Sequence, residues 1–172
     1  MGLKILYGIL IALGIFIVIT LIRAIFFVPK KRETKPLEKE NVDVDRAAKH
    51  LSGAIQIPTI SYSDKNRVDW WQFEKFHKFL EESYPLLHKT LEREDIAEAS
   101  LLYRWKGKNP DLEPIALLSH QDVVPIEPGT EGDWTHEPFS GYNDGEFIWG
   151  RGALDMKNHL IAVIQTVETL LS

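Results

Sequence analysis

The N-terminal part of the chain is almost uninterruptedly apolar, and this pattern predicts a membrane-spanning helix. Residues 5–22 contain no charged side chain, and these 18 residues would rise roughly 27 Å as a helix, close to the thickness of a bilayer core. Arg23 interrupts the run, but residues 24–28 are again apolar, and an arginine near the end of a helix can reach the headgroups. We therefore predict a transmembrane anchor helix over residues 1–29 that contacts the lipid bilayer through residues 5–28.

A cleaved signal peptide is the alternative interpretation of this segment. A signal peptide has an apolar core of about 7–15 residues followed by small residues at the cleavage site, whereas this run is longer and leads into Lys30, Lys31 and Arg32. Basic residues gather on the cytoplasmic side of membrane helices. More of them follow this helix than precede it, which taken alone would place the body of the protein in the cytoplasm.

Helical periodicity returns after a short polar segment. Residues 30–42 carry charges and a proline and are expected to form a linker. Apolar residues spaced by three and four positions predict three helices, over residues 43–53, 70–80 and 156–171. The apolar stripe of the second helix is assigned to the hydrophobic core. Gly53 and Pro85 are expected to end the first and second helices.

Short apolar and aromatic runs between these helices predict strands at residues 100–105, 115–119 and 147–149. Residues 127–145 are rich in Pro and Gly and predict a long irregular loop. Because strands and helices alternate, we expect an α/β fold over residues 43–172.

The composition limits the chemistry of this domain. The chain has 172 residues, of which 44% are hydrophobic and 26% charged, enough for one globular domain. It contains no cysteine, so a disulfide scaffold, a cysteine nucleophile and a thiolate metal site are excluded, and a metal ion must be held by His, Asp or Glu. Residues 36–172 carry 14 basic and 24 acidic residues, which argues against a partner that is a nucleic acid.

The first candidate for chemistry directly follows the predicted strand over residues 115–119. In open α/β sheets, ligands bind just beyond the carboxyl ends of the strands. His120 and Asp122 are two positions apart and lie on the same side of an extended chain. The imidazole can bind a metal ion through one nitrogen while a carboxylate on the other fixes its tautomer. A structural histidine without any ligand is the alternative.

The second candidate is the block from Gly150 to Lys157, which joins a predicted strand to a helix through two glycines. Asp155 stands at the expected start of that helix. It is interpreted either as a helix N-cap or as a carboxylate that bridges two metal ions.

The remaining histidines have no partner in these motifs. His50, His77 and His88 fall on or near the predicted helices and are expected at the surface. His136 lies in the long loop and His159 follows the second motif, so these two are the ones that could come close to a substrate or to the site.

Taken together, the motifs resemble the di-zinc metallopeptidase family that includes carboxypeptidase S, the aminoacylases, acetylornithine deacetylase and succinyl-diaminopimelate desuccinylase. The resemblance runs from about residue 51 to residue 172 and rests on several spaced motifs in order. These are Gly53-Ala54-Ile55-Gln56-Ile57-Pro58-Thr59, His120-Gln121-Asp122-Val123-Val124-Pro125, Trp134 with Pro138-Phe139-Ser140-Gly141, and the block from Gly150 to Lys157. The first motif and Asp155-Met156-Lys157-Asn158 are most similar to the carboxypeptidase S branch, which includes N-fatty-acyl amino acid hydrolases. Asn158 stands where many members of the wider family have Gly, and we interpret it as a mark of the branch.

The resemblance implies a zinc-peptidase-like α/β catalytic domain and a role for each of three residues. His120 is implied as a terminal ligand of one zinc ion, Asp155 as the carboxylate that bridges two zinc ions, and Asp122 as the catalytic-site residue that orients His120. A cis peptide bond after Asp155 is implied as well. The implied reaction is hydrolysis of the amide bond in peptides or N-acyl amino acids with a free carboxylate. Its cofactor is Zn²⁺, with Co²⁺ or Mn²⁺ as alternatives.

The family's other site residues do not occur after Asp155 in this sequence. The resemblance implies a Glu-Glu pair, a further acidic ligand, a distal His and a lid domain, all downstream of the last predicted helix. We therefore expect residues 43–172 to be the N-terminal part of a truncated catalytic domain, inactive by itself. The alternatives are a non-catalytic membrane-tethered protein that keeps the fold, and an acidic membrane-anchored binding module without metal.

The resemblance also bears on localisation. Relatives in the carboxypeptidase S branch hold their catalytic domain in a lumen or outside the cell, which is opposite to the orientation favoured by the charges. We expect a single-pass, membrane-anchored protein with an exported or lumenal body. No feature of the sequence indicates an oligomeric state.

Overall fold

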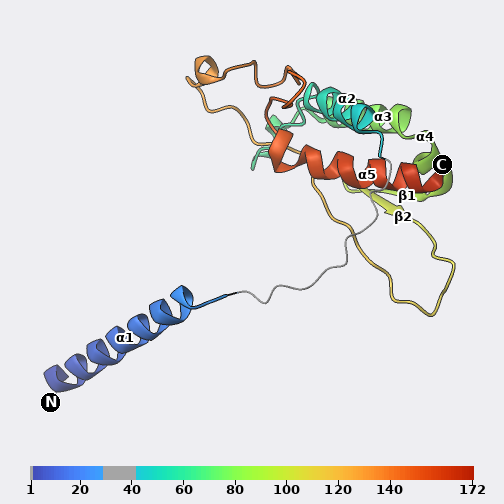
Figure 1. Ribbon diagram of the computed structural model, residues 1–172. Coiled ribbons are helices and arrows are strands. Elements are labelled where there is room, and N and C mark those ends of the chain that lie inside the picture. Colours follow the sequence, from blue (N-terminus) through green and yellow to red (C-terminus); the bar gives the residue numbers. More distant parts are fainter. Residues whose placement is uncertain (1, 29–41) are drawn as a thin grey trace. The chain divides into compact units, whose positions relative to one another are not determined.

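The computed structural model describes residues 2–28 and 42–172, which fall into two units (Figure 1). The first unit contains one helix, α1 (Gly2–Ile25), which has no buried residue and a mean hydropathy of 2.9 over its most apolar 18 residues. By length and composition this helix could cross a membrane, but a signal sequence near the N-terminus would have the same length and composition. The predicted helix is therefore present, and its insertion in a membrane stays a prediction. The predicted linker over residues 30–42 lies, except for Val42, outside the described residues.

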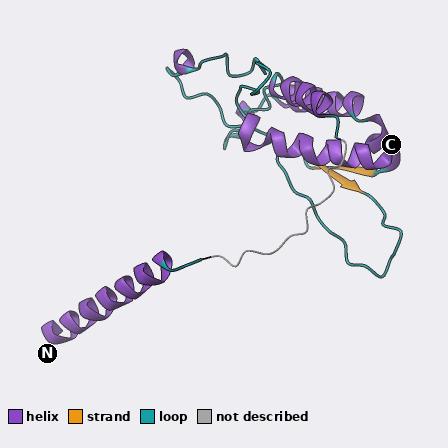
Figure 2. Ribbon diagram, in the orientation of Figure 1, coloured by secondary structure: helices purple, strands orange, loops and turns teal. Residues whose placement is uncertain are grey.

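The regular elements of the second unit are mainly helices, which are joined by long loops (Figure 2). Its helices are α2 (Val44–Ile55), α3 (Trp70–Ser83), α4 (Pro85–Thr90) and α5 (Asn158–Leu171), and its short turns are η1 (Lys65–Arg67), η2 (Glu131–Asp133) and η3 (Ala153–Lys157). Aspartates begin the first two helices, because each carboxylate accepts a backbone N–H of the first turn. Asp43 accepts from Arg46 N at 2.9 Å and Asp69 from Trp71 N at 3.2 Å.

The core lies where α2, α3, α4 and α5 meet. The stripe on α3 is buried as predicted, with Phe73, Phe76 and Leu80 at most 4% exposed. Burying apolar surface of this kind is the main stabilising contribution to such a unit. The cluster of buried side chains consists of Ala54, Ile57, Phe76, Leu80, Tyr84, Leu87, Leu160, Ile161 and Ile164.

One of the predicted helix ends is wrong. Gly53 does not end a helix but lies inside α2, where a Cβ would come within 2.9 Å of the Phe79 ring. The glycine therefore allows α3 to approach α2 closely. Pro85 follows the end of α3, as predicted, and also begins α4. Proline lacks a backbone N–H, and at the first helical position this loss costs nothing because an N–H there would have no helical partner.

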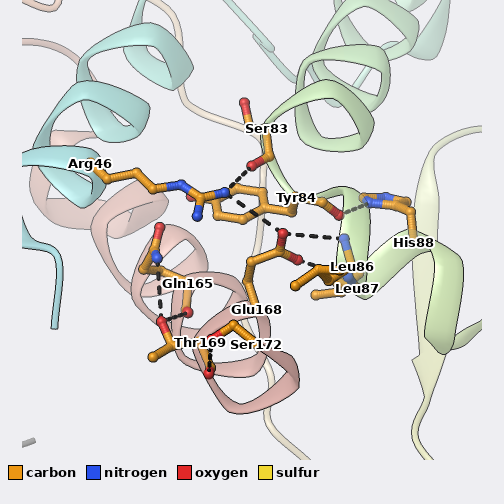
Figure 3. Close-up of polar contacts among 10 residues, drawn as sticks. All are labelled: Arg46, Ser83, Tyr84, Leu86, Leu87, His88, Gln165, Glu168, Thr169 and Ser172. Atoms are coloured by element: carbon orange, nitrogen blue, oxygen red, sulfur yellow. Dashed lines mark hydrogen bonds and ion pairs between the residues drawn. The ribbon is translucent and has the colours of Figure 1, made fainter. Parts of the chain in front are cut away.

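Glu168 of α5 is buried and joins three helices (Figure 3). Its carboxylate accepts hydrogen bonds from the backbone N–H groups of Leu86 at 3.2 Å and Leu87 at 2.7 Å, in the first turn of α4. Arg46 of α2 lies 3.7 Å from the same carboxylate and donates to the carbonyl of Ser83 at 2.8 Å. The first N–H groups of a helix lack helical partners, and α4 has no capping side chain of its own. Glu168 therefore caps α4 from a distant element.

The only sheet among the described residues is an antiparallel hairpin of β1 (Glu92–Ile96) and β2 (Ser100–Arg104), with Arg93 opposite Tyr103. Strand β2 matches the prediction for residues 100–105, and its Leu101 and Tyr103 pack against the core. Strand β1 was not predicted, since four of its five residues are charged.

Two predicted strands are not formed. Residues 115–119 run without pairing, and Ile115 and Leu118 are 87% and 80% exposed. A strand needs a neighbour for its N–H and C=O groups, and the described residues provide none there. Residues 147–149 form only an isolated bridge between Ile148 and Asn143. The α/β prediction is therefore met only as a mixture of helices with one small sheet, whereas residues 127–145 form the expected irregular loop.

Candidate metal site

His120 is held from one side by the residue two positions after it. Its Nδ1 lies 3.0 Å from the backbone oxygen of Asp122 and 3.3 Å from Oδ1 of the Asp122 carboxylate. The backbone oxygen can accept a hydrogen bond but cannot donate one, and the same holds for the carboxylate oxygen when the carboxylate is ionised. Nδ1 must therefore carry the proton, and in the neutral imidazole the lone pair is on Nε2.

Asp155 faces that second nitrogen from a distant part of the chain. His120 Nε2 lies 3.1 Å from Asp155 Oδ1, although the two residues are 35 positions apart. The side chains of His120 and Asp155 are 46% and 87% exposed, so both are open to a ligand from solution. The structure thus brings together His120, Asp122 and Asp155, the three residues singled out from the sequence; their catalytic and metal-binding roles stay a prediction.

The backbone at Asp155 explains why its carboxylate points outward. Asp155 has φ −128° and ψ 94°, which is not helical, and the residue that precedes α5 is Lys157. The interpretation of Asp155 as a helix N-cap is therefore wrong. The peptide bond between Asp155 and Met156 is cis, as the family resemblance implied.

The charges around His120 favour its protonated form when no cation is bound. Burial lowers the pKa of His120, but the contacts with the Asp122 carbonyl and the Asp155 carboxylate raise it by more, so the pKa lies above its usual value. Two acceptors placed on the two ring nitrogens are a favourable environment for a positive charge, whether that charge is a proton or a metal ion at Nε2.

The geometry fits two ligands of one zinc ion. Two donors that each lie 2.0–2.1 Å from a tetrahedral zinc are about 3.3 Å apart, close to the 3.1 Å between His120 Nε2 and Asp155 Oδ1. The carboxylate of Asp122 behind the other ring nitrogen is the usual arrangement around a zinc-binding histidine. A catalytic zinc ion has three protein ligands, and no group of three or more His, Cys, Asp or Glu suited to a metal occurs among residues 2–28 and 42–172. The described residues therefore supply part of a site.

Lys157 fixes the turn that carries Asp155. It is fully buried, and its Nζ donates hydrogen bonds to the carbonyl oxygens of Ala54 at 2.8 Å and Ile57 at 2.7 Å. The ammonium also lies 4.9 Å from the centre of the Phe76 ring. Burial lowers the pKa of Lys157 to about 7. The sequence motif contained this lysine, but nothing in it indicated that the side chain points into the core.

Gly152 allows the same turn to lie against the segment that follows His120. It has φ +83°, and a Cβ at this position would come within 2.5 Å of Val123 Cγ1. A side chain would therefore meet both an unfavourable backbone conformation and a clash. This close approach brings the Asp155 turn next to the residue that follows Asp122.

Sequence reasoning missed one polar residue of the site. Ser61 donates a hydrogen bond to Asp122 Oδ2 at 2.6 Å across 61 positions of sequence. A serine in a polar stretch carries no pattern that distinguishes it from a surface serine, so no signal could have identified it.

The histidines expected at the surface are half-buried instead, and each contacts another side chain, although His50 Nδ1 has no hydrogen-bond partner among the described residues. His50 packs edge-on against Tyr84, with ring centres 4.8 Å apart. His77 Nε2 lies 3.0 Å from Gln121 Oε1, and His88 Nε2 lies 2.9 Å from the Tyr103 hydroxyl. These side chains have structural roles. Of the two nearer the motifs, His159 is exposed, and His136 packs on Tyr142 and Trp149 in the long loop.

Comparison with known proteins agrees with the motifs. The family model described as "Peptidase family M20/M25/M40" matches residues 116–172. Carboxypeptidase S of Saccharomyces cerevisiae is 40% identical over 162 residues, which cover 83% of this chain and 28% of the yeast protein. Probable carboxypeptidase S-like 2 of Dictyostelium discoideum is 38% identical over 168 residues, covering 93% of this chain and 32% of that protein.

A human protein is similar as well. The N-fatty-acyl-amino acid synthase/hydrolase PM20D1 of Homo sapiens is 37% identical over 123 residues, which cover 70% of this chain and 24% of the human protein. The chain thus spans between about a quarter and a third of the length of these relatives.

Proposed function

We propose that the whole protein hydrolyses amide bonds with the help of bound metal. The premise is that the chain belongs to the peptidase family M20/M25/M40 and to its carboxypeptidase S-like branch. The proposed substrates are peptides or N-acyl amino acids with a free carboxylate, in line with the names of its relatives.

The observation that supports this proposal best is the meeting of His120 and Asp155. A nitrogen and a carboxylate oxygen from distant parts of the chain face each other at 3.1 Å, and both side chains are open to solvent. Asp122 holds the opposite ring nitrogen in its protonated form, so the lone pair of His120 Nε2 points at the place where a metal ion would lie. A structural histidine needs no such arrangement.

In this proposal His120 and Asp155 would hold zinc, with the carboxylate of Asp155 shared between two zinc ions in the complete site. Zinc held there would supply Lewis-acid activation of the scissile carbonyl and of a water molecule. Asp122 keeps the imidazole oriented and increases its basicity as a ligand. A complete site would need further ligands and a general base besides these residues. Co²⁺ and Mn²⁺ suit the same nitrogen and oxygen donors.

The experiment that tests the proposed reaction is a hydrolysis assay on the full-length protein purified in detergent. We expect cleavage of N-acyl amino acids and of peptides at the C-terminal residue. Blocking the substrate carboxylate as an amide should abolish cleavage, and a chelator should stop the reaction until zinc is returned.

Two pairs of variants make this assay specific for the site. His120→Ala and Asp155→Ala should abolish hydrolysis, whereas the exposed His159→Ala and Asp133→Ala should retain it. Full activity in either of the first two variants would show that the site is misassigned. A folded wild-type protein that hydrolyses none of these substrates would favour the alternative of a non-catalytic tethered protein.

We further propose that α1 is an uncleaved, single-pass anchor and that the body of the protein is exported or lumenal. The length and hydropathy of α1, and the bulky and basic residues that follow it in the sequence, support an uncleaved anchor. The orientation rests on the resemblance to the carboxypeptidase S branch alone, because the basic residues by themselves favour a cytoplasmic body. N-terminal sequencing of the mature protein should find Met1 or Gly2, with the protein in the carbonate-resistant membrane fraction. A start after residue 25, or release by carbonate, would identify α1 as a signal sequence or as a peripheral segment.

A further inference from the structure

The carboxylate of Asp122 is held from both ends. Its Oδ1 lies 3.3 Å from His120 Nδ1, and its Oδ2 accepts a hydrogen bond from the hydroxyl of Ser61 at 2.6 Å. The carboxylate is 42% exposed, so water competes for its oxygens. A hydroxyl at a fixed position limits rotation of the carboxylate, whereas water does not.

The backbone around Ser61 is itself hydrogen-bonded to the segment that carries Asp122. Ile60 and Val123 form a parallel bridge, in which Ser61 N donates to Val123 O at 3.0 Å and Val123 N donates to Thr59 O at 2.9 Å. The buried Thr59 hydroxyl donates to the carbonyl of Gln121 at 2.5 Å. These three hydrogen bonds fix the position from which Ser61 reaches Asp122.

The segment that precedes Ser61 is tied to the other half of the site. Lys157, two positions after Asp155, donates from inside the core to the carbonyls of Ala54 and Ile57. The segment from Ala54 to Ser61 therefore contacts both the turn of Asp155 and the carboxylate of Asp122. It connects the two parts of the chain that bring His120 and Asp155 together.

We propose that Ser61 is a positioning residue of the metal site, which holds the Asp122 carboxylate so that it orients His120 for binding a divalent metal ion. This inference rests on the proposed function, because it assumes that His120 is a metal ligand. Ser61 itself contacts neither metal nor substrate. Removing residues that contact a metal ligand typically weakens metal binding about 10–100-fold, and Ser61 is one contact further away, so we expect a loss of roughly 3–10-fold.

The test compares Ser61→Ala, Ser61→Thr and Ser63→Ala in the full-length protein. Ser63 is exposed, lies two residues on, and has no side-chain hydrogen bond among the described residues. Zinc affinity is measured by competition with a chelator at constant pH, and the melting temperature of the metal-free protein is recorded in parallel. Ser61→Ala should weaken zinc binding roughly 3–10-fold, while its metal-free form melts at the same temperature as that of Ser63→Ala. Ser61→Thr, which keeps the hydroxyl, should bind within about twofold of wild type.

A double variant separates positioning from general stability. If Ser61 acts through Asp122, the Ser61→Ala change should have no further effect on zinc affinity in an Asp122→Ala protein. The inference would be overturned if Ser61→Ala bound zinc as tightly as wild type. It would also be overturned if Ser61→Ala weakened zinc binding equally in the wild-type protein and in the Asp122→Ala protein. His120→Ala distinguishes this failure from that of the proposed function: if it binds zinc as tightly as wild type, the site itself is wrong.

Discussion

The Nζ of the buried Lys157 lies 2.7 Å from the carbonyl oxygen of Ile57. This hydrogen bond joins the residue two positions after Asp155 to the segment that leads to Ser61. Carbonyl groups at the end of a helix lack helical partners, and Lys157 donates to two carbonyls at and just beyond the end of α2. The structure of the site therefore depends on a buried lysine in the core.

Lys157→Met should destabilise the protein. Methionine fills similar space but removes the Lys157 donor from the carbonyls of Ala54 and Ile57, which then keep only their backbone donors, Ile57 N at 3.4 Å and Thr59 N at 2.9 Å. Each hydrogen bond that is lost costs about 0.5–1.5 kcal/mol. The gain from no longer burying an amine offsets part of this loss. Chemical denaturation checks the change against Lys75→Met, an exposed lysine on α3. Equal stability of the two variants would contradict the role given to Lys157.

Glu168→Gln should loosen the junction between α4 and α5. One carboxylate oxygen is replaced by an amide NH₂, which cannot accept from Leu86 or Leu87, and the attraction to Arg46 is lost (Figure 3). We expect a loss of about 1–2 kcal/mol in the free energy of unfolding. Glu74→Gln on the exposed face of α3 is the control, and it should change the stability little.

Gly152→Ala should reduce stability by more than the cost of placing alanine in a left-handed backbone conformation, and it should also weaken zinc binding. Gly129 has a similar φ of +88° and open space where a Cβ would lie, whereas a Cβ at Gly152 would clash with Val123. A left-handed conformation costs a non-glycine residue about 1–2 kcal/mol, so Gly129→Ala measures that cost by itself. Gly152→Ala should lose more stability than Gly129→Ala and should also bind zinc more weakly. Identical effects on both properties would rule out the close approach as the cause.

His50 should make the fold sensitive to mild acid. Burial, followed by the charges of Arg46 and Lys49, lowers the pKa of His50 in the folded state below its unfolded value of 6.5. The unfolded chain therefore binds more protons just below pH 6.5, and the free energy of unfolding falls as the pH drops through this window. His50→Leu should flatten this dependence between about pH 5 and 7 relative to wild type. An unchanged slope would mean that His50 is not buried as the structure has it.

The local pattern of the sequence was sufficient for α2, α3 and α5, whereas the short α4 was not predicted. The stripe on α3 was assigned to the core from spacing alone, because a helix with one apolar face has one way to bury it. Strand β1 could not be predicted in this way, since its charged residues pair through the backbone with β2. The opposite error occurred at residues 115–119, where β-forming side chains have no neighbouring strand among the described residues.

The site was predictable only where a motif existed. His120, Asp122 and Asp155 were found from motifs that resemble a known family, and the structure adds how Asp122 sets the tautomer of His120. Ser61 and the buried end of Lys157 depend on contacts across 61 and 100 or more positions. Such contacts follow from packing of the whole unit, and no short-range pattern records them.

The most direct test of the account is the zinc content of the full-length protein, measured by titration and elemental analysis. Wild type should bind two zinc ions. His120→Ala should lose at least one of them and Asp155→Ala should lose both, because Asp155 is proposed to bridge the pair. His159→Ala and Asp133→Ala should keep two. Two tightly bound zinc ions in both His120→Ala and Asp155→Ala would contradict the account.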